Sequence, residues 1–428
     1  MKKMLKVYFI LITFFAFVFS GYSQVTTASI SGKILDAKKE PLPGATIVAK
    51  HTPTGTTYGT VASSDGRYIL SGMRVGGPYV IEVSFVGYNS QKTNNLFLTV
   101  GEEATLNFNL SENTLELGEV IALGSKNQKF SSNRTGAQEV FTTESIEKLP
   151  TINRSLSDFT KLTPMNSGGN FGGTSYRYNN VTVDGASFNN SFGLSSSLGA
   201  SGTEPISLEA IDQIQVMIAP FDVRNGAFTG AGINSVTKSG TNEWKGTAYY
   251  YFKSPDLEGL KQKTVEVNKS DYTYNQKGFS VGGPIIKDKL FIFLNGEMDR
   301  KETPVSWQPS PAKGQQGDGQ SIVDVNTLQT LSDFLQSNFN YSPGSYNTSS
   351  VPTQADRITA RLDWNINSKN TLSFKYFYLK SFNTNMPSSS GATGGSRNPS
   401  ADRIPFSSSY YRTNNNFNII MEIGRAHV

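Results

Sequence analysis

Apolar and polar residues alternate strictly in the C-terminal half of the chain. In RITARLDWNINSKNTLSFKYFYL every second residue from Ile358 to Ile366 is apolar, and the pattern resumes from Leu372 to Tyr378. A period of two predicts β-strands with one apolar face, and the polar turn at 367–370 predicts a hairpin. A second hairpin is predicted in GFSVGGPIIKDKLFIFLNGEM, with its turn at Lys287 to Lys289.

Six such strands are expected after Glu243. Two long polar segments between them, 302–356 and 381–408, are expected to be loops. Strands of ~10 residues with short turns on one side and long loops on the other are typical of outer-membrane barrels. Six strands are fewer than the roughly eight of the smallest single-chain barrels, so residues 243–421 are interpreted as the start of an incomplete barrel. The six are Trp244 to Lys253, Gly278 to Ile285, Leu290 to Asp299, Ile358 to Ile366, Thr371 to Lys380 and Asn414 to Glu422.

The N-terminus has the pattern of an export signal. Lys2 and Lys3 precede an apolar run from Val7 to Phe19, and a cleavage site is expected before Gln24. The run is shorter than the ~20 residues that a membrane-spanning helix needs. We expect residues 1–23 to be a cleaved signal peptide, with an uncleaved anchor as the alternative.

Short strands separated by glycine turns are predicted between residues 25 and 112, and this pattern favours a small β-sandwich. His51 is interpreted as a solvated residue at a strand end. A zinc peptidase would need several His and Glu ligands at set spacing. The expected strands are Ala28 to Leu35, Thr46 to Lys50, Tyr68 to Leu70, Tyr79 to Phe85 and Thr105 to Leu110.

A mixed α/β region is predicted at 131–242. A helix is expected from Arg154 to Leu162, with Asn153 as its N-cap. A second short helix is expected at 207–211. The pair Asp184-Gly185 is the signal of a two-residue hairpin turn.

The amino-acid composition excludes several classes of functional site. The 428 residues include no Cys and two His, which excludes disulfides, thiol catalysis and a His-rich metal site. The formal net charge of +5 includes three Lys of the leader and forms no basic face for nucleic acid. No phosphate-binding loop or nucleophile elbow is present. We therefore assign no catalytic residue, cofactor or metal site and do not expect an enzyme.

The first folded region resembles a known domain. The strings SGKILDAKKEPLPGATIVAK, SSDGRYIL and GGPYVIEVSFVGY occur in the order typical of carboxypeptidase-regulatory-like domains, which are transthyretin-like sandwiches. The resemblance implies the β-sandwich at 25–112 and brings no peptidase chemistry with it.

The second region resembles the plug of TonB-dependent receptors. The Asp-Gly hairpin is followed by FDVRNGAFTGAGINSVTKSGTNEWKG, which is similar to the Oar-like subgroup. MIAP, at 217–220, stands where the family has an Arg-Gly pair, so a salt bridge of that Arg is in doubt. The resemblance implies a mainly β chain with three parts: sandwich, α/β plug and the first strands of a barrel. It also marks plug-motif residues, namely Asp184, Gly185, Asn234, Thr237 and Lys238.

The linker at 113–130 contains a short apolar stretch that resembles a TonB box. Such a stretch can add as a strand to a partner's sheet, although a buried edge strand would have the same pattern. The expected TonB contact comprises Glu119, Val120, Ile121, Ala122 and Leu123.

The function implied by the resemblance is TonB-energised uptake of an unidentified ligand at the cell outer membrane. The implied partners are the TonB periplasmic domain, outer-membrane lipid and the barrel-assembly machinery, with no nucleic acid. The alternative is a surface adhesin or structural protein that transports nothing. Candidate ligand contacts are Tyr176, Arg177, Tyr178 and Asn179, which a packed plug turn would explain equally well.

The C-terminal string EIGRAHV, at 422–428, is expected to be an artefact, because it matches the translation of a common sequencing adapter. On this hypothesis the gene continues beyond Met421, and the chain is an N-terminal fragment.

Overall fold

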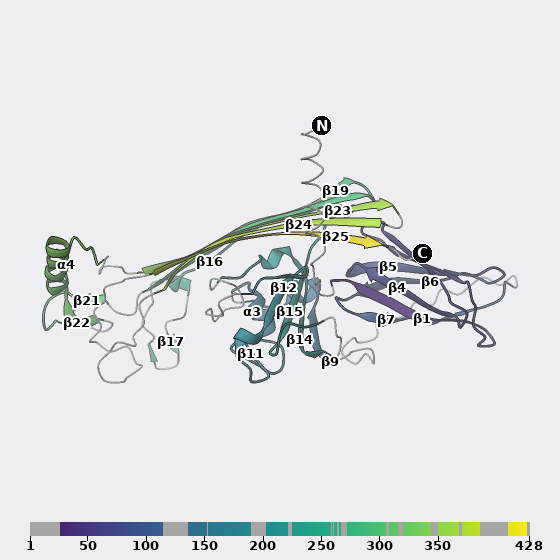
Figure 1. Ribbon diagram of the computed structural model, residues 1–428, viewed down its shortest axis with the longest axis horizontal. Coiled ribbons are helices and arrows are strands. Elements are labelled where there is room, and N and C mark those ends of the chain that lie inside the picture. The colour runs from purple at the N-terminus through teal and green to yellow at the C-terminus, as the bar shows by residue number, and fades with distance from the viewer. Residues whose placement is uncertain are drawn as a thin grey trace, which may run out of the picture.

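The computed structural model describes residues 26–113, 136–151, 153–189, 203–220, 225–257, 259, 261–262, 265–266, 272–304, 308–315, 320–343, 350–367, 370–385 and 410–425. They form three parts (Figure 1). A long curved sheet, the wall, arches over a central plug, and a β-sandwich lies at one end of both. The chain is mainly β, and the wall sheet does not close into a barrel.

The sandwich consists of two small sheets around an apolar core that contains Ile30, Ile47 and Tyr79. Alternate residues of β2 are buried, as expected of strands with one face on the core. One sheet has the order β4-β1-β7, with β8 also pairing with β1, and the other has the order β3-β2-β5-β6. The strands are β1 (Ala28–Asp36), β2 (Thr46–His51), β3 (Thr57–Val61), β4 (Arg67–Met73), β5 (Gly76–Ser84), β6 (Gln91–Leu98), β7 (Glu103–Thr105) and β8 (Phe108–Leu110).

Two expectations for the sandwich were wrong in detail. The strand expected from Thr105 to Leu110 is split into β7 and β8, which pair with different parts of β1. His51 is not solvated but 5% exposed. Its Nδ1 lies 2.7 Å from Thr54 Oγ1, and its ring packs on Tyr79. Strands β3 and β6 were not predicted at all.

The plug is built on a five-stranded sheet of order β13-β12-β15-β14-β9. In β12 and β15 every residue is buried, which suits central strands covered on both faces. The elements are β9 (Gly136–Phe141), α2 (Thr143–Lys148), α3 (Leu156–Thr160), β10 (Asn166–Ser167), β11 (Asn170–Phe171), η3 (Tyr176–Tyr178), β12 (Asn180–Val183), β13 (Ala186–Ser187), η4 (Leu208–Ala210), β14 (Ile211–Pro220) and β15 (Gly232–Thr237).

The expected plug helix is shorter than predicted, and its N-cap is Ser155 instead of Asn153. Ser155 and Asp158 form a capping box, in which the side chain of each residue accepts a hydrogen bond from the backbone N–H of the other. The helix ends before Leu162, which is therefore exposed instead of continuing the apolar face. The second expected helix is the single turn η4. Helix α2 was not predicted.

The wall contains the six expected strands, all antiparallel and in chain order. Both predicted hairpins are confirmed, but five of the six strands are longer than expected, and β16 begins one residue later than expected. They are β16 (Lys245–Lys253), β19 (Thr273–Ile286), β20 (Leu290–Pro304), β23 (Ser350–Asn367), β24 (Asn370–Asn385) and β25 (Tyr410–Arg425). β25 continues through Arg425, so part of the suspected artefact string pairs as strand; the origin of that string stays a prediction.

The long connections of the wall contain further elements, so the loop expected at 302–356 was wrong in part. Helix α4 begins after Asp324, whose carboxylate accepts from the N–H and hydroxyl of Thr327, and ends at Asn340 in the left-handed conformation. No helix among the described residues is long and apolar enough to cross a membrane. The added elements are η5 (Pro255–Leu257), β17 (Lys261–Gln262), β18 (Val265–Glu266), β21 (Gln308–Ser310), β22 (Gln320–Asp324) and α4 (Val325–Phe339).

The two ends of the wall differ. The hairpin turns β19–β20 and β23–β24 lie beside the sandwich, and α4 with β21 and β22 lies at the opposite end (Figure 1). The plug therefore has a sandwich end, near the short turns, and a far end, near the long connections.

Candidate functional site

The predicted Asp-Gly hairpin is present at the sandwich end of the plug. Thr182 pairs with Ser187 and Val183 with Ala186, which leaves Asp184 and Gly185 as the two turn residues. Both have positive φ, 48° and 84°. This is the conformation that a two-residue type I′ turn requires, and Asp followed by Gly adopts it at low cost.

Asp184 is the centre of the plug motif. Its carboxylate accepts from the Thr237 N–H at 3.1 Å and from the Thr237 hydroxyl at 2.5 Å. Asn234 lies on the same strand as Thr237, and its Oδ1 accepts from Thr182 Oγ1 at 3.2 Å. These side chains are at most 2% exposed. The structure therefore joins Asp184 directly to Thr237, and joins Asn234 to Thr182 on the strand before the turn; the role of these residues as a plug motif stays a prediction.

The side chain of Lys238 points away from the Asp184 cluster and toward Glu209. Its N–H donates to the Ala210 carbonyl at 2.8 Å, and its Nζ lies 3.6 Å from Glu209 Oε1. Glu209 also accepts from Arg154 at 3.2 Å and from the wall residue Thr247 at 2.9 Å. Lys238 thus ties the end of β15 to η4 and to the first wall strand.

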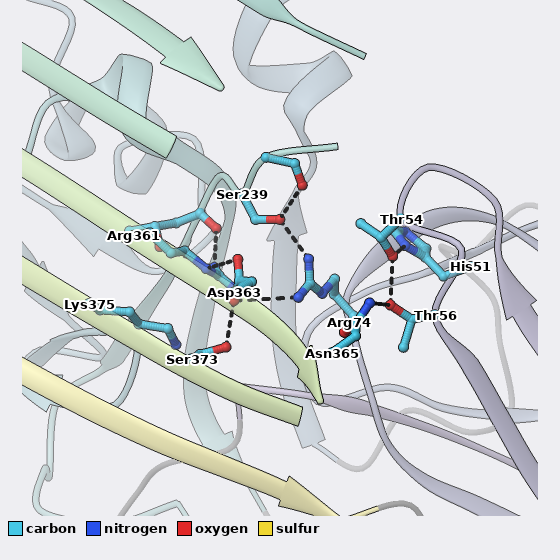
Figure 2. A network of polar contacts seen from close by, with 12 residues as sticks. His51, Thr54, Thr56, Arg74, Ser239, Arg361, Asp363, Asn365, Ser373 and Lys375 are labelled. Atoms are coloured by element: carbon cyan, nitrogen blue, oxygen red, sulfur yellow. Dashed lines mark hydrogen bonds and ion pairs between the residues drawn. The ribbon is translucent and has the colours of Figure 1, made fainter. Parts of the chain in front are cut away.

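A buried charged cluster of the wall faces the plug at this end (Figure 2). Arg361 donates from Nη1 to the Thr237 carbonyl at 2.7 Å and from Nε to Asp363 at 2.8 Å. Ser373 donates to the same Asp363 carboxylate at 2.5 Å. Lys375 Nζ lies 3.7 Å from Asp184 Oδ1, so the wall contacts the plug turn directly.

The sequence indicates which face of the wall strands these residues occupy, but it does not indicate that they form a cluster. Arg361, Asp363 and Lys375 occupy the polar positions of the alternating strands, which is the face turned away from lipid. The alternation shows which side chains share a face of the strand, but it does not show which plug residues they contact. The contacts with Thr237 and Asp184 could therefore not be predicted.

A second buried cluster joins plug and wall further along. Arg357 of β23 donates to Glu297 at 2.8 Å and to the carbonyl of the plug residue Glu204 at 2.8 Å. Glu297 also accepts from Ser207 of the plug at 2.7 Å and from Tyr249 of β16 at 2.6 Å. Plug and wall are thus joined by polar contacts at both clusters.

Glu204 and His51 are among the titratable groups outside the wall strands whose pKa is perturbed by burial. The pKa of Glu204 is raised to about 7, first by desolvation, against the lowering effect of Arg357. Its Oε2 is buried without a partner among the described atoms. The pKa of His51 is lowered to about 3 by desolvation and by Arg74, so the imidazole is neutral at physiological pH.

The candidate ligand contacts lie at the opposite end of β12 from the Asp184 turn. β12 begins at Asn180, directly after them, and ends at the Asp184 turn on the sandwich side. Arg177 and Tyr178 are exposed, and Arg177 stacks 5.9 Å from the ring centre of Tyr176. Asn179 is buried: its amide donates to the Gly169 carbonyl and accepts from the Ala231 N–H, so a structural role accounts for it.

The candidate TonB contact, 119–123, lies outside the described residues, but its flanks are placed. The sandwich ends with a bridge between Tyr88 and Glu112, and the plug begins with Gly136, which pairs with Pro220 at the edge of the plug sheet. The linker therefore joins the sandwich to an edge strand of the plug. In the described part of the chain, no group of three or more acidic or His residues is arranged to hold a metal ion.

Two family profiles match the chain. The profile described as an outer membrane beta barrel domain matches residues 236–422, and that of the carboxypeptidase regulatory-like domain matches residues 29–111.

Curated relatives match as well. The TonB-dependent transporter Oar of Myxococcus xanthus is 26% identical over 268 residues, which are 59% of this chain and 23% of Oar. The TonB-dependent receptor SusC of Bacteroides thetaiotaomicron is 32% identical over 156 residues, which are 36% of this chain and 14% of SusC. The chain thus spans less than a quarter of the length of these relatives.

Among solved structures, the siderophore receptor PirA from Acinetobacter baumannii matches with 20% identity and a TM-score of 0.40, over 58% of this chain and 32% of PirA. The two domain profiles occur in the order sandwich then barrel, with the Asp-Gly plug motif between them. Together with the curated relatives, they identify the chain as a TonB-dependent outer-membrane receptor of the Oar type.

Proposed function

We propose that the full-length protein is a transporter that takes up a ligand through the outer membrane and is energised by TonB from the periplasm. The observation that carries this proposal is the polar attachment of the plug to the wall. Among the described residues, only two from the wall, Phe293 and Phe377, join the apolar cluster of the plug. The remaining ties named above are hydrogen bonds and ion pairs.

Polar attachment suits a plug that has to move. A buried ion pair contributes little net stability, because desolvation of both charges offsets their attraction. It does fix one geometry, since leaving either charge unpaired is costly. Arg361, Arg357 and Lys375 would therefore hold the plug in one position without joining it to the wall as a single core.

The two ends of the plug fit the two sides of a membrane. The short turns and the sandwich would face the periplasm, where the linker with Val120 would be accessible to TonB. The long connections and the exposed Arg177 and Tyr178 would face outward, where a ligand arrives. Lipid would surround the wall, and the barrel-assembly machinery would insert it. An adhesin that keeps the same fold but moves nothing remains the second candidate.

The test is a backbone substitution in the TonB contact of the full-length protein. Strand addition uses main-chain N–H donors, and Pro lacks one. Val120→Pro should weaken binding to the purified TonB periplasmic domain at least tenfold, whereas the control Val120→Ala should bind as the parent protein does. Equal abundance of all three proteins in outer-membrane fractions is required for the comparison.

Unchanged binding by Val120→Pro would refute the assignment of 119–123. If the parent protein itself does not bind TonB while residing in the outer membrane, the adhesin is the better description.

A further inference from the structure

The sandwich makes a buried contact with both plug and wall through one side chain, Arg74. Its Nη1 donates to Ser239 Oγ, just beyond plug strand β15, at 2.6 Å. Its Nη2 lies 3.4 Å from Asp363 Oδ1 of the wall. Asp363 is the carboxylate that also binds Arg361, which holds the Thr237 carbonyl. Arg74 thus completes the network that fixes the end of β15 (Figure 2).

A second contact lies at the turn between β2 and β3. Asn365 of the wall donates to Thr56 Oγ1 at 2.9 Å, and Thr56 is hydrogen-bonded through Thr54 to the buried His51. Since His51 is neutral at physiological pH, this chain of hydrogen bonds carries no charge into the contact.

The same turn approaches the first wall hairpin closely. A Cβ on Gly55 would lie 2.1 Å from Asp288 Oδ1, and the φ of Gly55 is +65°, so glycine is favoured there. The carboxylate of Asp288 accepts from Asn242 at 2.7 Å, and the N–H of Asn242 donates to the Pro53 carbonyl at 2.8 Å. Sandwich, plug exit and wall therefore meet at one point.

A third contact joins the sandwich to the plug sheet. The amide of Gln213 accepts from the Val100 N–H at 2.9 Å and donates to the Leu98 carbonyl at 3.2 Å. Gln215 donates to the Val100 carbonyl at 3.2 Å. The only apolar cluster of described residues that spans this boundary is small, with Val75, Val100 and Val236 fully buried.

These contacts are specific but sparse. A cavity of about 2590 Å³ borders the sandwich, the plug and the wall, and Arg74, Asp212 and Arg361 are among its lining residues. Packed apolar area is what makes a domain interface permanent, and polar interfaces between domains of one chain separate more readily. The sandwich is therefore docked in a defined position that it can leave.

We propose that the N-terminal sandwich is an intramolecular latch. While it is docked, Arg74 holds Ser239 and Asp363 together and keeps the end of β15 fixed against the wall. The plug is free to move only after the sandwich has undocked. The inference rests on the proposed function for its purpose, because a latch matters only in a receptor whose plug moves.

The position of the linker fits this role. It connects Glu112 of the sandwich to Gly136 of the plug, so a partner that pulls on it loads both parts at once. The sandwich contacts would then break before, or together with, the plug contacts.

A single cysteine in this cysteine-free chain provides the test. Ser235 lies in β15, is fully buried, and its hydroxyl has no partner among the described atoms, so Ser235→Cys is close to neutral. The full-length protein carrying it, with any Cys outside residues 1–428 replaced by Ser, would be purified in detergent micelles and labelled with a maleimide. When closing is fast, the labelling rate reports the equilibrium population of the open plug.

Adding Arg74→Ala should speed this labelling about tenfold, since hydrogen bonds to a charged group are lost. The matched control is Arg67→Ala, because Arg67 is an exposed sandwich residue that pairs with Asp65 alone at 3.1 Å. Ser239→Ala removes one Arg74 contact from the plug side and should also speed labelling, which guards against an effect on sandwich folding.

Unchanged labelling in both Arg74→Ala and Ser239→Ala would overturn the latch. An increase in Arg67→Ala as large as in Arg74→Ala would do the same. The assay contains no TonB, so a protein that fails to bind TonB can still pass it, and failure of the latch leaves the TonB experiment intact.

Discussion

Lys375 is a lysine whose side chain is almost completely buried, at 2% exposure, in a wall strand that faces the plug. A buried ammonium requires charged or hydrogen-bonding partners, and the Asp184 carboxylate is one of them at 3.7 Å. The pair joins an expected plug-motif residue to a wall residue that the sequence did not single out.

A double-mutant cycle measures this tie. Asp184→Ala and Lys375→Met should each lower the free energy of unfolding by about 3 kcal/mol, because each leaves a buried charge without that partner. The double variant should lose less than the sum, with a coupling of about 1–3 kcal/mol. Urea unfolding of the full-length protein in detergent gives the values. Lys380→Met, at an exposed residue of the same strand, is the control, and additive losses would contradict the interaction between Asp184 and Lys375.

Glu204 is a second residue whose burial has a measurable consequence. Its folded-state pKa of about 7 lies above the ordinary value of 4.5, chiefly through desolvation. The groups that act on it are Arg357, Asp158 and the backbone amides of Leu156 and Ser157. A carboxyl with a raised folded-state pKa binds more protons folded than unfolded between these values, so stability falls as pH rises from about 4.5 to 7.

Glu204→Gln removes this dependence. The variant should be more stable than the parent by up to about 3 kcal/mol at pH 8, and the difference should shrink toward pH 4.5. Urea midpoints measured across this range test it. The exposed variant Glu147→Gln should follow the parent at every pH, and a Glu204→Gln difference that does not vary with pH would show the carboxyl to be normal.

Among the elements, the wall strands share a recurrent device: an aromatic ring that covers a glycine on the neighbouring strand. A Cβ on Gly283 would lie 2.3 Å from the Trp244 ring. A Cβ on Gly278 would lie 2.5 Å from the Tyr249 hydroxyl, and a Cβ on Gly296 would lie 2.8 Å from the Phe279 ring. The ring fills the space that the missing side chain leaves, and this restores packing to a strand that glycine weakens.

Gly283→Ala should therefore destabilise the wall by about 1–3 kcal/mol, because Trp244 has to move. Its fluorescence should change with it. Gly226→Ala is the matched control, since a Cβ there has nothing within 4 Å and the φ of Gly226 is not in the left-handed region. Equal urea midpoints for the two variants would mean that Trp244 yields without cost.

The elements also show how far periodicity goes. The strict alternation of β23 and β24 located both strands and their turn, because one face of each strand contacts the plug and the other points away from it. Helix α4 was taken for loop although Leu328, Leu331 and Leu335 recur at helical spacing, because the segment lies within a long stretch that is mostly polar. Helix α2 is short, buries no residue and has no apolar period to detect. The N-cap of α3 was misplaced by two residues, because Asn153 and Ser155 are both good caps.

For the whole molecule, the order of the three parts could be predicted, but the contacts between sandwich, plug and wall could not. The Asp-Gly turn and the family motif placed Asp184 and Thr237. Arg74 and Asp363, however, lie in different domains, and neither stands in a local pattern that indicates a partner. Contacts of this range depend on how complete domains pack, which a period of two or of 3.6 does not encode.

The difference between the two ends of the wall has a consequence for how such a receptor can evolve. Both described hairpin turns lie beside the sandwich, and the turn at Asp288 takes part in the joint. The connections that contain β17, β18, β21, β22 and α4 lie at the other end. Insertions and replacements can therefore accumulate in the long connections without altering a single latch contact. On the proposed function, choice of cargo and control of release would be separate modules, and a lineage could exchange the first while it inherits the second.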